Sequence, residues 1–327
     1  MKTLACWLVG TTLAVAAATT NAEEIAVGNY GVSANGMPFG VALHKGYFKE
    51  EGLNITGLIS SAGGGTSLRN MLAGGGVPYG EVNPGVVVSA ILAGADLKIV
   101  SDNVLTVAEF VWAVKPDSPI KSLKDFKGKK IGYTNPRSTS QALARMLLQA
   151  GGYSEADAEL VKTGGFGEGI AALDSGQIDV AAITEPLWSK VKHKYRAVVV
   201  ASDTLPPLDN VVGVTTVEMA EKKGDFIRAV IRARRKAVIF MRDHPDEAAA
   251  IVAKEYNIDL DVAKSAVRNL TQSKTKGVPY WGEGAIHLEG LKRMIEAQRS
   301  VGAITGEVDY NKIIDTRFLP DDLKALR

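Results

Sequence analysis

The stretch KKIGYTNPRSTSQALARMLLQAGG, residues 129–152, gives the clearest indication of the fold. A short apolar strand is expected at residues 131–133, followed by a turn that contains Pro136 and by three hydroxyl residues at 138–140. Apolar residues then recur at the spacing of one helix face, and Gly151 is expected to end this helix in the left-handed conformation. Strand, turn and helix in this order are the repeating unit of an α/β fold.

The start of this helix is a candidate anion site. The first backbone N–H groups of a helix have no intrahelical acceptor and lie at the positive end of its dipole, so they can bind a carboxylate, sulfonate, phosphate or nitrate. The candidate residues are Ser138, Thr139 and Ser140, with Arg137 beside them as a further positive charge. In the alternative interpretation, a hydroxyl group only caps its own helix and Arg137 is an exposed loop residue.

Similar helix starts recur along the sequence, each directly after an expected strand. They lie near Pro38, Thr66, Pro84, Ser138 and Pro186. In parallel α/β sheets, ligands bind outside the carboxyl ends of the strands, where such helix starts gather. We therefore expect a binding site that is shared by several turns.

The composition argues against several classes of protein. The 327 residues are 46% hydrophobic and 23% charged, which is typical of a folded chain with room for two cores. The formal net charge of +2 predicts no general attraction to nucleic acid or to a membrane surface. Cys6 is the single cysteine and the four histidines lack ligand spacing, so neither a metal nor a cofactor is expected. No G-x-S-x-G or G-x-G-x-x-G motif is present, so catalysis and dinucleotide binding are not indicated.

The first 22 residues have the pattern of a secretory signal peptide. Lys2 is followed by an apolar run at 4–18 and by a small-residue cleavage site that ends at Ala22. The run is shorter than the roughly 20 residues that span a bilayer, and no later segment reaches that length. The mature protein is therefore expected to be exported. It is also expected to be a monomer.

Strand and helix patterns alternate up to about residue 224, after which the sequence is mainly helical. Segments rich in proline at 115–119 and 206–207 interrupt the pattern, and we interpret them as crossings between two lobes. The expected lobes are residues 23–114 with 213–327, and residues 115–212.

Several other side chains are candidates for the ligand site. Glu81 and Glu185 each end an expected strand, and they either stabilise the following helix or contact a ligand that has a donor or cationic part. Three aromatic residues lie near expected loops or crossings, although a tryptophan more often belongs to a core: Tyr30, Trp112 and Trp281.

Motifs spread over the sequence resemble those of a known family. Residues 43–55, LHKGYFKEEGLNI, are similar to the G-Y-F-x-x-E-G-L motif of the solute-binding proteins of nitrate, sulfonate, taurine and thiamine-precursor importers. Further similar segments follow in the family's order: GGT at 64–66, LKDFKGKKIG at 123–132, STS at 138–140, ALDSGQIDVA at 172–181, EP at 185–186 and VDYNKIID at 308–315. The resemblance covers nearly the whole mature sequence.

The resemblance implies an α/β, periplasmic-binding-protein-like fold, with two lobes joined by two crossover segments and the ligand in the cleft. It implies the periplasmic component of an ABC importer, which captures a small anion such as a sulfonate, taurine, nitrate or a related acid and delivers it to a permease in the inner membrane. The cleft residues that it implies are Ser33, Asn35, Gly64, Gly65, Thr66, Glu81, Asn83, Ser138, Thr139, Ser140, Thr184, Glu185 and Pro186.

The alternative function is binding or synthesis of the thiamine pyrimidine precursor on the same fold. Proteins of that group resemble one another in a cysteine-rich motif, whereas this sequence has no cysteine after Cys6. The expected export signal also argues against a cytosolic synthase. We therefore expect a binding protein and not an enzyme.

Overall fold

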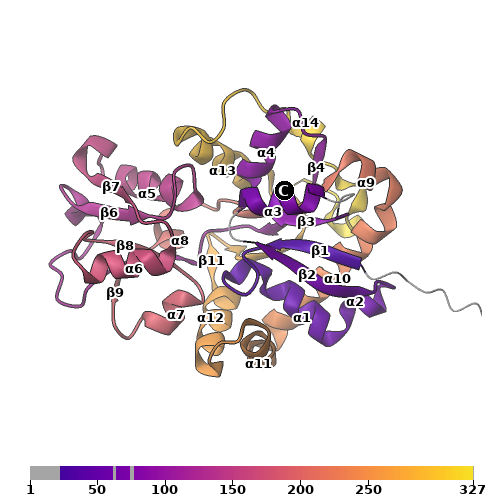
Figure 1. The fold of residues 1–327 in the computed structure, drawn as a ribbon, viewed down its shortest axis with the longest axis horizontal. Helices are drawn as coiled ribbons and strands as arrows, with labels where there is room; N and C mark the ends of the chain where they lie inside the picture. Colours follow the sequence, from indigo (N-terminus) through magenta and orange to yellow (C-terminus); the bar gives the residue numbers. More distant parts are fainter. Residues whose placement is uncertain (1–22, 62–63, 74–76, 327) are drawn as a thin grey trace, which may run out of the picture.

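The structure is a computed structural model that describes residues 23–61, 64–73 and 77–326. It has the α/β, two-lobed fold that was expected, and the lobes lie side by side in Figure 1, each with its own strands and hydrophobic core. The expected signal peptide, residues 1–22, lies outside the described residues. Within the described ranges, no helix combines the length and the apolar character needed to cross a bilayer.

The larger lobe is built on a six-stranded mixed sheet with the order β13-β4-β10-β3-β1-β2. Strand β1 pairs in parallel with β2 and β3, whereas β10 runs antiparallel to β3 and β4. The strands are β1 (Glu23–Gly28), β2 (Ile55–Ser61), β3 (Gly80–Val82), β4 (Leu97–Val104), β10 (Val211–Thr216) and β13 (Trp281–Gly284). Because β1, β2 and β3 are parallel, the turns that follow them lie at one edge of the sheet.

Helices pack on this sheet through apolar faces. The longest, α10 (Gly224–Asp243), buries residues at helical spacing from Phe226 to Met241, in the same core as β1 and β4. The helical region expected after residue 224 is thereby confirmed. The other α-helices of this lobe are α1 (Met37–Lys45), α2 (Tyr47–Glu50), α3 (Gly64–Leu72), α4 (Pro84–Leu92), α9 (Val217–Lys222), α11 (Pro245–Tyr256), α12 (Leu260–Gln272), α13 (Leu288–Ser300) and α14 (Tyr310–Ile313).

The smaller lobe contains two small sheets. In one, β5 (Phe110–Val114) lies between β8 (Ala181–Thr184) and β9 (Arg196–Val200), antiparallel to both. In the other, β6 (Lys130–Tyr133) pairs in parallel with β7 (Glu159–Lys162). The helices of this lobe are α5 (Thr139–Ala150), α6 (Phe166–Asp174), α7 (Leu187–Val191) and α8 (Ala201–Thr204), and a separate hairpin is formed by β11 (Lys274–Thr275) and β12 (Val278–Pro279).

The stretch at 129–152 folds into β6 and α5, as predicted. Of the predicted apolar face of α5, Leu143 and Leu147 are fully buried and confirmed, whereas Ala150 at its end is exposed. The prediction for the end of this helix was wrong by one residue. Gly151 has a φ of −76°, and Gly152, with a φ of 86°, takes the left-handed conformation. The chain turns there because the N–H of Gly152 donates to the carbonyl of Gln149 at 3.0 Å.

The strand at 110–114 belongs to the smaller lobe, and this corrects its expected place in the first lobe. All five of its residues are buried, and both of its neighbours, β8 and β9, belong to the smaller lobe. A strand buried on both faces reads as a continuous apolar run, which carries no information about its partners. The remaining lobe limits stay a prediction.

Candidate functional site

A cavity of about 480 Å³ lies between the two lobes and is lined by residues of both. Turns after strands β1, β3 and β6 reach it, as the position of strand ends in parallel sheets predicts. Of the residues expected at the ligand, the structure brings together Ser33, Asn35, Gly65, Thr66, Glu81, Asn83, Arg137, Ser138, Thr139, Ser140 and Thr184. Their contact with a ligand stays a prediction.

The N-terminus of α5 presents backbone donors to this cavity. Ser138 caps the helix, because its hydroxyl accepts a hydrogen bond from the N–H of Gln141 at 3.2 Å. The hydroxyl of Ser140 accepts from the N–H of Thr134 at 3.0 Å, and that of Thr139 accepts from Asn83 Nδ2 at 2.8 Å. Because a hydroxyl that accepts a hydrogen bond can still donate one, a ligand can meet the hydroxyl of Thr139 as well as the backbone N–H groups at the start of α5.

Two more helix N-termini reach the cavity from the larger lobe. Gly65 and Thr66, in the first turn of α3, line it. Asn83 is the N-cap of α4, and its Oδ1 accepts a hydrogen bond from the N–H of Gly85 at 2.8 Å. Three helix dipoles therefore have their positive ends at one cavity, which favours a negative charge there.

The charged side chains that line the cavity are Arg69, Arg137 and Glu81. Both arginines are exposed, and they come from different lobes. Arg69 Nη2 donates to Thr66 Oγ1 at 2.9 Å, so the guanidinium lies over the N-terminus of α3. Since Glu81 is engaged elsewhere, the two arginines leave the cavity with an excess of positive charge.

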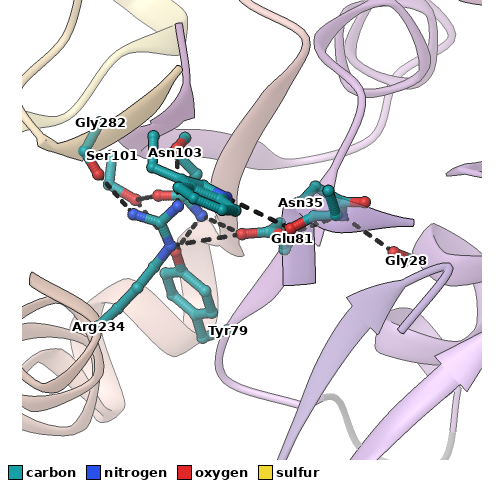
Figure 2. A network of polar contacts seen from close by, with 10 residues as sticks. Gly28, Asn35, Tyr79, Glu81, Ser101, Asn103, Arg234 and Gly282 are labelled. Carbon is teal, nitrogen blue, oxygen red and sulfur yellow. Dashed lines mark hydrogen bonds and ion pairs between the residues drawn. The ribbon is translucent and has the colours of Figure 1, made fainter. Parts of the chain in front are cut away.

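Glu81 is fully buried beneath the cavity, at the centre of the network in Figure 2. Its Oε1 accepts from Asn35 Nδ2 at 2.9 Å, its Oε2 accepts from Asn103 Nδ2 at 2.8 Å, and Arg234 Nε lies 3.5 Å from Oε2. Burial raises the pKa of Glu81, while the charge of Arg234 and the two amide donors lower it. The carboxylate is therefore committed to contacts within the larger lobe.

Arg234 completes this network and is itself 2% exposed. Its Nη1 donates to the carbonyl of Gly282 at 2.6 Å and its Nη2 donates to that of Asn103 at 2.7 Å, as Figure 2 shows. Asn103 Nδ2 also donates to the hydroxyl of Tyr79 at 2.9 Å, and burial raises the pKa of Tyr79 to about 12. This ion pair thus links β3, whose Glu81 lines the cavity, to β4 and β13 of the same sheet.

Glu185 and Pro186 are not among the residues that line the cavity. Glu185 is 2% exposed and accepts hydrogen bonds from the N–H and the hydroxyl of Ser189, both at 3.0 Å, which stabilises the first turn of α7. It also accepts from Asn269 Nδ2 of α12 at 2.8 Å. The carboxylate therefore fastens the smaller lobe to the larger one, and its structural interpretation is confirmed.

The three aromatic candidates also lie away from the cavity. Tyr30 donates to Glu255 Oε2 at 3.1 Å, and burial and this carboxylate raise its pKa. Trp281 is buried and its Nε1 donates to the carbonyl of Ala34 at 3.3 Å. Trp112 is 0% exposed, in the core of the smaller lobe. Because its side chain is buried there, the prediction that Trp112 contacts the ligand was wrong. The place of Gly64 at the ligand stays a prediction.

Sequence reasoning missed several residues that line the cavity, among them Val32, Arg69, Phe110, Phe166 and Asn210. Phe166 follows the glycine-rich turn at 163–165, and Arg69 lies one turn into the helix after a glycine run, so a search of the residues behind each turn would find both. Asn210 lies in the return crossing, and no local pattern marks it.

Comparison with known proteins agrees with this architecture. The chain matches the family model described as NMT1/THI5 like over residues 33–248. It is 26% identical over 202 residues to a putative aliphatic sulfonates-binding protein of Escherichia coli K12, and this match spans 62% of either chain, less than two thirds of that relative's length. It is 23% identical over 301 residues to the riboflavin-binding protein RibY of Chloroflexus aurantiacus, covering 86% of this chain and 82% of RibY.

Among solved structures, the periplasmic aliphatic sulphonate binding protein SsuA from Escherichia coli is similar, with a TM-score of 0.75 at 20% identity. The superposition covers 90% of this chain and 92% of SsuA, and it supports the fold. These relatives are all named as binding proteins. Because the family model matches more than half of its residues, this chain belongs to the NMT1/THI5-like family.

Proposed function

We propose that this protein is the periplasmic solute-binding component of an ABC importer, which captures one small organic anion between its lobes and delivers it to a permease in the inner membrane. The observation that carries the proposal is the cavity between the lobes, where three helix N-termini meet two arginines and the nearby carboxylate of Glu81 is already paired. The proposal includes the predicted export signal at 1–22, a monomeric mature protein, and lobes at 23–114 with 213–327 and at 115–212, except that β5 belongs to the smaller lobe.

The ligand that fits best is an acid with a hydrocarbon part, such as an organosulfonate. A cavity of about 480 Å³ is in the range of small-molecule sites and far exceeds the size of nitrate. Its apolar lining includes Phe110 and Phe166, whose ring centroids are 5.9 Å apart in an edge-to-face arrangement. Val32, 66% exposed, adds an apolar surface from the larger lobe. The anion is expected at α5 and the hydrocarbon against these side chains.

The cavity supports binding and not catalysis. Among the lining residues described, none is a histidine, the most frequent general base, and Ser138, Ser140 and Glu81 are each hydrogen-bonded to other protein groups. Within the described residues, no group of three potential ligands could hold a metal ion. A cleft that closes on its solute through contacts from both lobes needs neither a catalytic side chain nor a metal ion.

The decisive experiment removes one backbone donor at the start of α5. Proline is tolerated at the first helical position, and Ser138 before it is already extended, with a φ of −81° and a ψ of 162°. Thr139→Pro removes both the N–H and the hydroxyl, whereas the control Thr139→Val removes only the hydroxyl. Since a hydrogen bond to a charged group contributes about 1.5–3 kcal/mol, Thr139→Pro should weaken binding about 10- to 100-fold more than Thr139→Val.

Calorimetry and melting shifts with hexanesulfonate, benzenesulfonate, taurine and nitrate would measure this difference, with hexylamine as the cationic control. We expect saturable binding of at least one organosulfonate and none of hexylamine. Equal affinity of the two variants for the best anion would show that the start of α5 is not the anion site. Binding of hexylamine alone would overturn the proposed ligand class.

A further inference from the structure

Two crossover segments join the lobes and lie side by side. The first, residues 105–109, connects β4 to β5, and the second, residues 205–210, connects α8 to β10. The backbone N–H of Asn210 donates to the carbonyl of Val104 at 2.8 Å, and its Nδ2 donates to Glu109 Oε1 at 2.5 Å. Rotation of one lobe against the other must therefore change the contacts between these segments.

Three carboxyl groups are buried at this junction. Asp102 and Asp209 are 0% exposed and Glu109 is 1% exposed. The carboxyl groups of Asp102 and Asp209 both contact His287, and the two interact with each other. Among the described residues, no N–H or O–H donor reaches either oxygen of Asp209. Two adjacent buried carboxylates cannot both be ionised at low cost, so the pair holds a shared proton.

Neighbouring groups offset the negative charge of the pair only in part. The N–H of His287 donates to Asp102 Oδ2 at 3.2 Å, and His287 Nδ1 lies 3.5 Å from Asp209 Oδ1. Burial raises the pKa of Asp209 to about 7, although the contact with Asp102 and the charge of Arg293 lower it. Burial and the charge of Asp209 raise the pKa of Asp102 well above its ordinary value, and contact with His287 offsets this only partly.

Glu109, like Asp209, has a pKa raised to near neutral pH. Burial raises its pKa to about 8, against the lowering effect of its own backbone N–H, of the hydrogen bond from Asn210 and of the nearby Tyr280 hydroxyl. The charge of Glu185 adds to the rise. Its Oε2 meets no other donor among the described residues. Both crossover segments thus carry a buried acid that changes its protonation near neutral pH.

His287 gives this cluster a route to solvent. Its side chain is 20% exposed and lines a second cavity, of about 370 Å³, which shares no lining residue with the cavity between the lobes. Leu105 of the first crossover segment and Tyr280 line the same second cavity. Protons can therefore reach the junction without passing through the ligand site.

We propose that the junction is a proton-controlled hinge, in which protons held by the Asp102–Asp209 pair and by Glu109 keep the crossover segments together and the lobes in the arrangement described here. When these protons leave to solvent through His287, adjacent buried carboxylates repel each other and water enters between the segments. The lobes then open more readily. The proposed hinge depends only on the contacts between the two crossover segments. Its consequence, that opening of the lobes releases the ligand, rests on the proposed function.

The test follows the radius of gyration by small-angle X-ray scattering without any added ligand, from about pH 5 to about pH 9. This range brackets the raised pKa of Asp209, about 7, and that of Glu109, about 8. For the wild type, we expect the radius to increase across neutral pH. Asp209→Asn gives Asp102 an amide donor and removes the shared proton, and Glu109→Gln removes the second titration. Each variant should lose a large part of the increase, and the double variant nearly all of it.

Unfolding by urea at each pH provides a second readout. The folded protein keeps these protons up to about pH 7 or 8, whereas the unfolded chain releases them near pH 4. The urea midpoint should therefore fall as the pH rises from about 4 to about 8. Asp209→Asn should make that fall shallower. The matched control is Asp203→Asn, an exposed residue two positions before the second crossover segment, which should change neither readout.

A radius that does not change with pH in the wild type would overturn the proposal. So would an unchanged response in Asp209→Asn and Glu109→Gln when circular dichroism shows that both are folded. Because no ligand is present, these outcomes leave the proposed function untouched.

Discussion

Arg234→Met should lower the free energy of unfolding by about 3–5 kcal/mol, the usual cost of removing one partner of a buried ion pair. Arg234 supplies the positive charge nearest to Glu81, and its two Nη atoms hold the carbonyls of Gly282 and Asn103. Without it, Glu81 would be a fully buried carboxylate with only two amide donors. Urea denaturation at neutral pH measures the loss.

The pH dependence of this variant identifies the cause. Burial already raises the pKa of Glu81, and loss of the charge of Arg234 would raise it further. Because the unfolded chain binds fewer protons than the folded one above pH 4, the deficit of Arg234→Met should grow as pH rises from about 4.5 to about 7.5.

A double-mutant cycle provides the control. Glu81→Met in the Arg234→Met background removes the uncompensated charge, so the double variant should be destabilised less than the sum of the two single variants. An additive cycle, or a loss below about 1 kcal/mol for Arg234→Met, would mean that the pair does not stabilise the sheet of the larger lobe.

Trp112→Ala should cost about 3–5 kcal/mol of stability, the range for removing a large aromatic side chain from a core. Trp112 is 0% exposed, and its ring stacks near that of Phe110 with centroids 6.3 Å apart and planes at 27°. It shares a hydrophobic cluster with Leu143 and Leu147 of α5. The loss should appear in the urea midpoint measured by circular dichroism.

Trp112→Phe is the matched control, because it keeps an aromatic ring and leaves a smaller cavity. It should lose less stability than Trp112→Ala and should keep the anion affinity of the wild type. An unchanged urea midpoint in Trp112→Ala, together with weakened ligand binding, would place this side chain at the ligand, as the sequence first suggested.

Prediction from sequence succeeded where the information is local. The helix at 139–150 follows from its apolar period and from the hydroxyl residues before it, and both features depend on residues within four positions of one another. The position of the strand at 110–114 did not follow, because its apolar run is compatible with either lobe. Trp112 was misplaced for the same reason.

By itself, the sequence determined the alternation of strands and helices, the turns that carry polar residues and glycine, and hence the main part of the candidate site, including Ser138–Ser140 and Asn83. Only the tertiary structure decided which charges remain available. Arg234 neutralises Glu81, Asn269 binds Glu185, and Asp102 meets Asp209 across the crossover segments. Each of these pairs joins residues far apart in the chain, and both burial and charge interactions depend on distance in space, which no local pattern encodes.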